Sequence, residues 1–106
     1  MVLHFVPYRL RAPRNATGHE QRGAHYAVVV QSDLLPLSTW LVAPTSTAAQ
    51  PASFRPEIDI EGTGTLVLAE QTTAVDPQRL GTHVGRLSLH EMAEFDAALR
   101  TVLGLR

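Results

Sequence analysis

Short apolar or β-branched runs, separated by turn residues about every ten positions, dominate this chain. The pattern predicts several short strands rather than alternating strands and helices. The strongest run, residues 25–32, is apolar at successive positions, which predicts a strand with both faces buried in the centre of a sheet. Residues 2–10 also have strand character, but Pro7 lacks a backbone N–H and therefore predicts an edge position for them.

Further segments extend the strand pattern. A β-rich run contains the single Trp, a later run alternates polar and apolar side chains as a half-buried strand does, and a Gly-containing turn then predicts a hairpin. The strands expected here are residues 38–43, 55–60, 65–71 and 83–87, with the hairpin turn at 61–64. The connecting loops and turns expected from Pro, Gly, Asn and Ser are residues 11–24, 33–37, 44–54 and 75–77.

The end of the chain changes to a helical period. Ser88 and Glu91 have the spacing of a capping box, and Gly104 is a suitable stop. The apolar stripe expected to face the core consists of Met92, Phe95, Leu99, Val102 and Leu103. The predicted fold is mostly β with a C-terminal helix: a small, mostly antiparallel β-barrel of the SH3 or OB kind, forming a single domain over residues 1–106.

Composition narrows the function. The 106 residues include no Cys, which excludes disulfides, Cys-ligated zinc and a thiol nucleophile. The net charge of −1 is not that of a polycation built for duplex nucleic acid, yet residues 1–25 hold four Arg and one acid, a local charge of +3. This excess indicates either an anion-binding face or a solvated loop. The five His have no metal-ligand spacing, and no stretch has the apolar length of a membrane span or the pattern of a signal peptide, so we expect a cytoplasmic protein without a metal or cofactor.

Two segments carry the most specific pattern. Residues 18–26 read Gly-His-Glu-Gln-Arg-Gly-Ala-His-Tyr and lead into Ala-Val-Val-Val, and residues 42–47 read Val-Ala-Pro-Thr-Ser-Thr. Together they resemble the MazF/PemK family of toxin endoribonucleases, in which a Glu-Gln…Arg-Pro motif precedes one strand and a Thr-Ser or Thr-Thr pair ends the next. Similar segments follow at residues 68–71, 75–80, 84–88 and 103–105, so the likeness covers about residues 18–105.

The resemblance implies a compact SH3-like or CcdB-like barrel, usually a homodimer, that cleaves single-stranded RNA without a metal and is neutralised by a cognate antitoxin. In this reaction the ribose 2′-hydroxyl attacks the adjacent phosphate, which requires a base, an acid and donors to the phosphoryl oxygens. By position, Glu20 is the expected base and Thr45 a donor to a phosphoryl oxygen. The residues expected to add donors or hold the RNA are Gln21, Arg22, Ser46 and Thr47.

The sequence departs from the family pattern at two places. His25 stands where the family has its catalytic Arg, and Tyr26 stands where it has Pro. A His, with an ordinary pKa near ~6.5, can protonate the leaving oxygen, but it lacks the permanent charge and bidentate fork of Arg. The first strand, in addition, lacks the Arg-Gly and the acidic residue with which the relatives open. We therefore expect either a diverged active enzyme, with His25 as its acid, or a copy with weak activity.

Other readings stay open. Glu20 and Arg22 are also typical of charged residues in solvated loops. His25 is equally typical of a His that packs at the start of a strand. Thr45 and Ser46 are common turn residues. At the level of function, the alternative is a binding module of the same fold that grips RNA or an antitoxin without turnover. DNA gyrase, the target of the related CcdB toxins, is a weaker alternative because the chain ends in Leu-Gly-Leu-Arg, without an aromatic anchor.

Overall fold

The structure, a computed structural model, describes residues 4–10, 26–31 and 38–105. The strands are β1 (His4–Leu10), β2 (Tyr26–Gln31), β3 (Trp40–Ser46), β4 (Glu57–Ile60), β5 (Thr63–Val67), β6 (Thr73–Val75) and β7 (Leu80–His83). Two 3₁₀ turns, η2 (Ala69–Gln71) and η3 (Pro77–Arg79), and one helix, α1 (Leu89–Leu103), complete it. No helix in the described part of the chain is long and apolar enough to cross a membrane.

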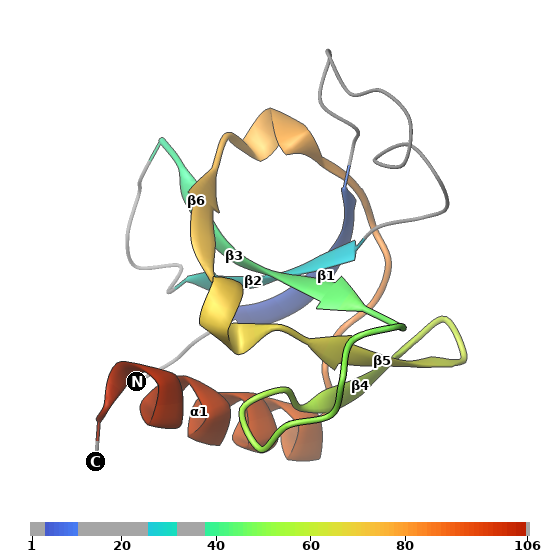
Figure 1. Cartoon of the computed structure of the whole chain (residues 1–106). Helices are drawn as coiled ribbons and strands as arrows, with labels where there is room; N and C mark the ends of the chain where they lie inside the picture. Colours follow the sequence, from blue (N-terminus) through green and yellow to red (C-terminus); the bar gives the residue numbers. More distant parts are fainter. Residues whose placement is uncertain (1–3, 11–25, 32–37, 106) are drawn as a thin grey trace.

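All strand pairs are antiparallel, and the seven strands run in the order β4-β5-β3-β2-β1-β7, with β6 paired to β3. The sheet curls into a half-barrel, and α1 begins beside β4 and packs against η2 (Figure 1). The predicted fold class, a small antiparallel β-barrel with a C-terminal helix, is therefore confirmed. The strand β3 joins the two parts of the sheet, because it pairs with β2 and β6 along its first half and with β5 at its end.

The central strand β2 supplies both hydrophobic cores, as its uninterrupted apolar run predicts. Val28 and Val30 face a core completed by α1, whereas Ala27 and Val29 face a second core on the opposite side of the sheet. The first core contains Ala43, Ile58, Ile60, Val67, Ala69, Leu87, Phe95 and Ala98; the second contains Val42 and Leu80, with Trp40 and Val75 packed against it. The side chain of Phe95 is fully buried and anchors the helix.

The helix α1 begins and ends where the sequence predicts. Ser88 Oγ accepts from Glu91 N at 3.0 Å, and Glu91 Oε1 accepts from Ser88 N at 2.8 Å, which completes the capping box. Gly104 ends the helix in the left-handed conformation, at φ 70°. The predicted apolar stripe is correct only for its first members: Met92, Phe95 and Leu99 pack on the core, but Val102 and Leu103 are 37% and 64% exposed.

Several predicted strand boundaries are wrong. The edge position predicted for the first strand is incorrect, because β1 lies between β2 and β7. Pro7 fits there because the pairs with β7 begin only at Tyr8. The strand predicted at 38–43 runs two residues beyond Pro44 and ends at Ser46. The strand predicted at 65–71 ends at Val67, where η2 takes over.

Two further differences concern the next segments. The strand β6 was not expected from the sequence, because three residues are too few to show an alternating pattern. The last strand lies at Leu80–His83 rather than 83–87, since Gly85 adopts a φ of 149°, outside the range of extended L-residues. The predicted segments 11–24 and 33–37 lie outside the described residues.

Candidate functional site

The candidate site lies at the end of β3, where this strand changes partners. The ladder between β2 and β3 ends at the pair Ala27–Pro44, and the next residues of β3 pair with β5, Thr45 with Val67 and Ser46 with Leu66. Pro44 suits this crossing, because it has no N–H to offer to β2 and its carbonyl accepts from Leu68 N at 2.8 Å. The change of partner leaves three consecutive hydroxyl side chains, on residues 45–47, at the strand end.

Thr45 is fixed against the start of β2. Its Oγ1 donates to the backbone carbonyl of Tyr26 at 2.8 Å, and both residues are partly buried. Tyr26 directly follows His25 in the chain, so this bond ties Thr45 to the backbone next to the expected acid. The Tyr26 hydroxyl in turn donates to Glu61 Oε2 at 3.4 Å, in the turn between β4 and β5. Sequence reasoning missed the role of Tyr26, since a backbone carbonyl has no sequence pattern.

The hydroxyl of Ser46 accepts hydrogen bonds from the segment that follows it. Ser46 Oγ accepts from Ala48 N at 3.1 Å and from Ala49 N at 3.0 Å, which shapes the chain as it leaves β3. Both acceptor positions of this oxygen are thereby used, and its own hydrogen remains available as a donor. Thr47 is exposed. Thr45, Ser46 and Thr47 thus follow one another at the strand end, with the Thr45 hydroxyl directed at Tyr26 and the Ser46 hydroxyl at the amides of the following segment.

The remaining site predictions, Glu20, Gln21, Arg22 and His25, lie outside the described residues. Among the residues that the structure describes, no three His, Asp or Glu are arranged to hold a metal ion. His83 and His90 are exposed.

An ion pair that sequence reasoning did not single out lies close to the strand end. Arg55 donates from Nε and Nη2 to the same oxygen of Glu70, Oε2, at 3.0 and 2.6 Å. The side chains of Arg55 and Glu70 are only 22% and 26% exposed. The hydrogen bonds from Arg55 lower the pKa of the Glu70 carboxyl below its ordinary value, so this carboxylate is charged at neutral pH. Glu70 was noted only as part of a family-like segment, and nothing in the spacing of Arg55 marks it.

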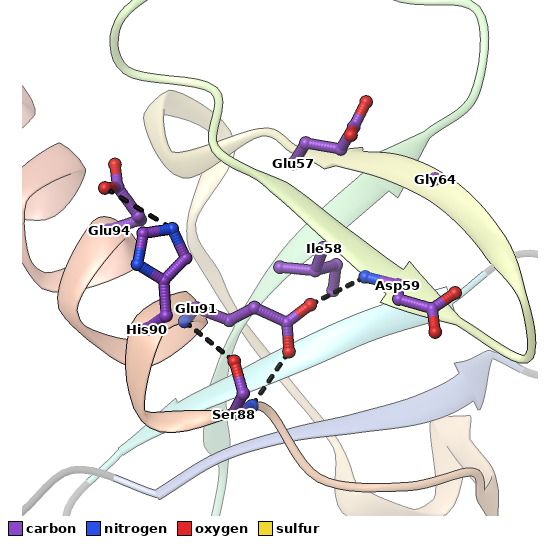
Figure 2. A pocket seen from close by; sticks show the side chains of 8 residues that line it. All are labelled: Glu57, Ile58, Asp59, Gly64, Ser88, His90, Glu91 and Glu94. Atoms are coloured by element: carbon purple, nitrogen blue, oxygen red, sulfur yellow. Dashed lines mark hydrogen bonds and ion pairs between the residues drawn. The ribbon is translucent and has the colours of Figure 1, made fainter.

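An open groove of about 740 Å³ lies between β4 and the start of α1 (Figure 2). Its lining includes the carboxylates of Glu57, Asp59, Glu91 and Glu94, beside His90. Glu91 Oε2 accepts from Asp59 N at 2.7 Å, so this carboxylate joins the helix start to β4 (Figure 2). A groove with this charge repels phosphate groups and is therefore unsuited to nucleic acid.

Comparison with known proteins identifies the family of the chain. The sequence pattern of the PemK-like, MazF-like toxins of type II toxin-antitoxin systems matches residues 8–103. The chain is 41% identical over 106 residues to the candidate toxin Rv3098A of Mycobacterium tuberculosis, and the match covers 99% of this chain and 100% of that protein.

Solved structures share the fold. An endoribonuclease of a mycobacterial species, solved in complex with its cognate antitoxin, superposes with a TM-score of 0.78 at 17% identity, covering 100% of this chain and 98% of that one. MazF of Deinococcus radiodurans superposes with a TM-score of 0.71 at 20% identity, covering 96% of this chain and 94% of that one. With the family pattern matched from residue 8 to residue 103, this chain belongs to the PemK-like, MazF-like toxins of type II toxin-antitoxin systems.

Proposed function

We propose that this chain is a metal-independent endoribonuclease that cleaves single-stranded RNA and is neutralised by a cognate antitoxin. The observation that carries the proposal is the hydroxyl cluster at the end of β3, with Thr45 bonded to the residue that follows His25. Hydroxyl and backbone donors at a strand end suit phosphoryl oxygens, and the basic N-terminal quarter adds positive charge. The endoribonuclease of the mycobacterial complex has the same fold, which supports the reaction class.

The proposed reaction is a transesterification. Glu20 takes the proton of the ribose 2′-hydroxyl, whose oxygen forms a bond to the adjacent phosphorus. The bond from phosphorus to the 5′-oxygen breaks, and His25 gives that oxygen a proton. The products are a 2′,3′-cyclic phosphate and a 5′-hydroxyl end, and no metal or cofactor takes part.

The remaining residues hold the phosphate. Thr45 has one hydroxyl hydrogen, which bonds to Tyr26 in the free protein, and rotation about the Cβ–Oγ1 bond turns it toward a phosphoryl oxygen when RNA binds. Ser46 needs no such exchange, because its hydrogen is already available. Thr47 and Gln21 add hydrogen bonds, and Arg22 attracts the RNA backbone.

We further infer a homodimer of a single domain spanning residues 1–106, acting in the cytoplasm, where the RNA is found. The basic N-terminal quarter supports a shared RNA face, with residues 11–24 and 44–54 of both copies on one side. Sedimentation at micromolar concentration is expected to show a dimer, and an 11.6 kDa species alone would contradict it.

The decisive experiment incubates the purified chain with mixed-sequence single-stranded RNA in EDTA and maps the ends. We expect cleavage to persist and to leave cyclic phosphates. Activity that disappears in EDTA and returns with Mg²⁺ overturns the mechanism. Binding of RNA without cleavage supports the alternative, a module of the same fold without turnover, for which the replacement of the family Arg by His25 is the motivating observation.

A further inference from the structure

The segment that leads away from the hydroxyl cluster, residues 47–56, connects β3 to β4 and is called here the 47–56 loop. Both of its ends are fastened to one stretch of chain. Just before the loop, Pro44 O accepts from Leu68 N at 2.8 Å, and at its end Pro56 O accepts from Val67 N at 2.8 Å. The two ends of the loop are therefore fixed by the backbone of residues 67–68.

The middle of the loop depends on a side chain. Arg55 Nη1 donates to the backbone carbonyl of Gln50 at 3.0 Å, while Nε and Nη2 of the same guanidinium bind Glu70 in η2. The guanidinium carbon lies 5.6 Å from the centroid of the Phe54 ring, a cation–π distance. One side chain thus joins the centre of the loop, the end of the loop and η2.

Glu70 is suited to hold this arginine. Its second oxygen, Oε1, is buried and makes no hydrogen bond in the structure, whereas Oε2 accepts both hydrogen bonds from Arg55. An arginine matched by a partly buried carboxylate has little charge left to offer an RNA phosphate. The pair is better placed to shape the loop than to touch the substrate.

We propose that Arg55 and Glu70 are positioning residues that hold the 47–56 loop in the shape that presents Ser46 and Thr47 to RNA. This inference rests on the proposed function. The start of the loop is already shaped by the two N–H groups bonded to Ser46, and Arg55 fixes the part that follows, at Gln50. Loss of the pair displaces the loop and thereby weakens RNA binding and blurs the choice of cleavage site, while the chemical step is largely kept.

The test compares Arg55→Ala, Glu70→Gln and the double variant with the parent. The matched control is Arg100→Ala, which removes an arginine bound to Asp96 at 2.8 Å on the outer side of α1. For the single variants we expect KM for a defined RNA to rise about tenfold, kcat to change less than about twofold, and cleavage sites to broaden. The double variant is expected to be no worse than Arg55→Ala, because both changes break one interaction.

The sign of the Glu70→Gln effect separates this role from direct phosphate binding. If Arg55 were a phosphate ligand, Glu70→Gln would release it and tighten RNA binding, and that result overturns the proposal. Unchanged KM and site choice in both single variants overturn it as well.

Hydrogen exchange of the Ala48 and Ala49 amides supplies a readout that needs no RNA. We expect faster exchange in both single variants, and unchanged exchange in Arg100→Ala. If the parent protein neither binds nor cleaves RNA, the proposed function is contradicted. Faster exchange of the loop amides in the variants would still establish that the Arg55–Glu70 pair orders the loop. Unchanged exchange would show that the pair does not order the loop.

Discussion

The hydroxyl of Thr45 donates to the carbonyl of Tyr26 at 2.8 Å and so closes the open end of the β2–β3 ladder. The bond stands in for the backbone contact that would follow the pair Ala27–Pro44. Thr45 consequently has two duties in this molecule, one in the fold and one in the proposed chemistry.

The two duties of Thr45 can be separated by substitution. Thr45→Val keeps the shape but removes the hydroxyl, and we expect a loss of about 1 kcal/mol in the free energy of unfolding together with a fall in RNA cleavage of about 10²-fold. Thr45→Ser keeps the hydroxyl and is expected to retain most of both. Denaturant unfolding and single-turnover cleavage measure the two effects. Full cleavage by Thr45→Val would leave Ser46 and Thr47 as the phosphate donors.

Replacement of His25 tests the proposed acid. His25→Ala is expected to lower the cleavage rate about 10²- to 10⁴-fold, the usual contribution of a positioned acid. The parent should lose activity as pH rises above neutral, because the protonated imidazole is then depleted, and His25→Arg should flatten this decline. The measurement is the cleavage rate against pH, with the melting temperature followed in parallel. A fully active His25→Ala variant would identify His25 as a packing residue.

The ion pair between Arg55 and Glu70 predicts a specific acid sensitivity. The pKa of Glu70 is lowered by its hydrogen bonds from Arg55, so the folded state binds this proton less readily than the unfolded state does. The stabilisation is present above the ordinary value of 4.5 and is lost as pH falls through the lowered pKa. Unfolding measured from pH 7 to pH 3 should show this loss in the parent and a smaller one in Glu70→Gln. Equal pH dependence in the two proteins would show that the pair contributes nothing to stability.

The start of α1 gives a graded series of stability changes. Ser88→Ala is expected to cost about 1 kcal/mol, because it removes one half of the capping box. Glu91→Ala should cost more, about 2 kcal/mol, since Glu91 accepts from the backbone of both Ser88 and Asp59. The control is Glu94→Ala: Glu94 is exposed, and its neighbour His90 lies 3.8 Å away. If Ser88→Ala reduced the free energy of unfolding as much as Glu91→Ala, the hydrogen bond from Asp59 N to Glu91 would contribute nothing to stability.

Truncation at two apolar positions of the same helix should reduce the free energy of unfolding by very different amounts. Phe95→Ala opens a cavity in the first core and is expected to cost about 3–5 kcal/mol. Leu103→Ala, at a position 64% exposed, should change the free energy of unfolding by less than about 0.5 kcal/mol. Thermal unfolding of the two variants checks this. A large cost at Leu103 would show that a second chain covers the end of the helix.

Local patterns predict the fold well where a residue's neighbours in sequence decide its structure. The capping box of Ser88, the alternation at residues 57–60 and the double-sided burial of β2 are of this kind, and all are present. Prediction fails where contacts with residues distant in sequence determine the structure. The strand β3 continues beyond Pro44 because its last residues pair with β5. The three residues of β6 form a strand because they pair with β3.

The candidate site divides in the same way. The hydroxyl residues 45–47 were found through their order in the family-like pattern, and the structure places them where β3 ends. The roles of Tyr26, Arg55 and Glu70 were not predicted from the sequence. A backbone carbonyl that accepts a hydrogen bond, and an ion pair between residues fifteen positions apart, produce no recognisable sequence pattern. Three-dimensional contacts alone identify them.

The strand β3 also constrains how this toxin can lose its activity over evolutionary time. A mutation that prevents β3 from forming would remove its pairings with β2, β5 and β6 at once. The chain would then unfold and be degraded. Copies that persist as folded proteins without activity are therefore expected to keep the apolar residues of β3 and to carry their changes at its hydroxyl positions or in the connecting segments. A survey of such copies should find Val42 and Ala43 intact beside altered hydroxyl positions or loops.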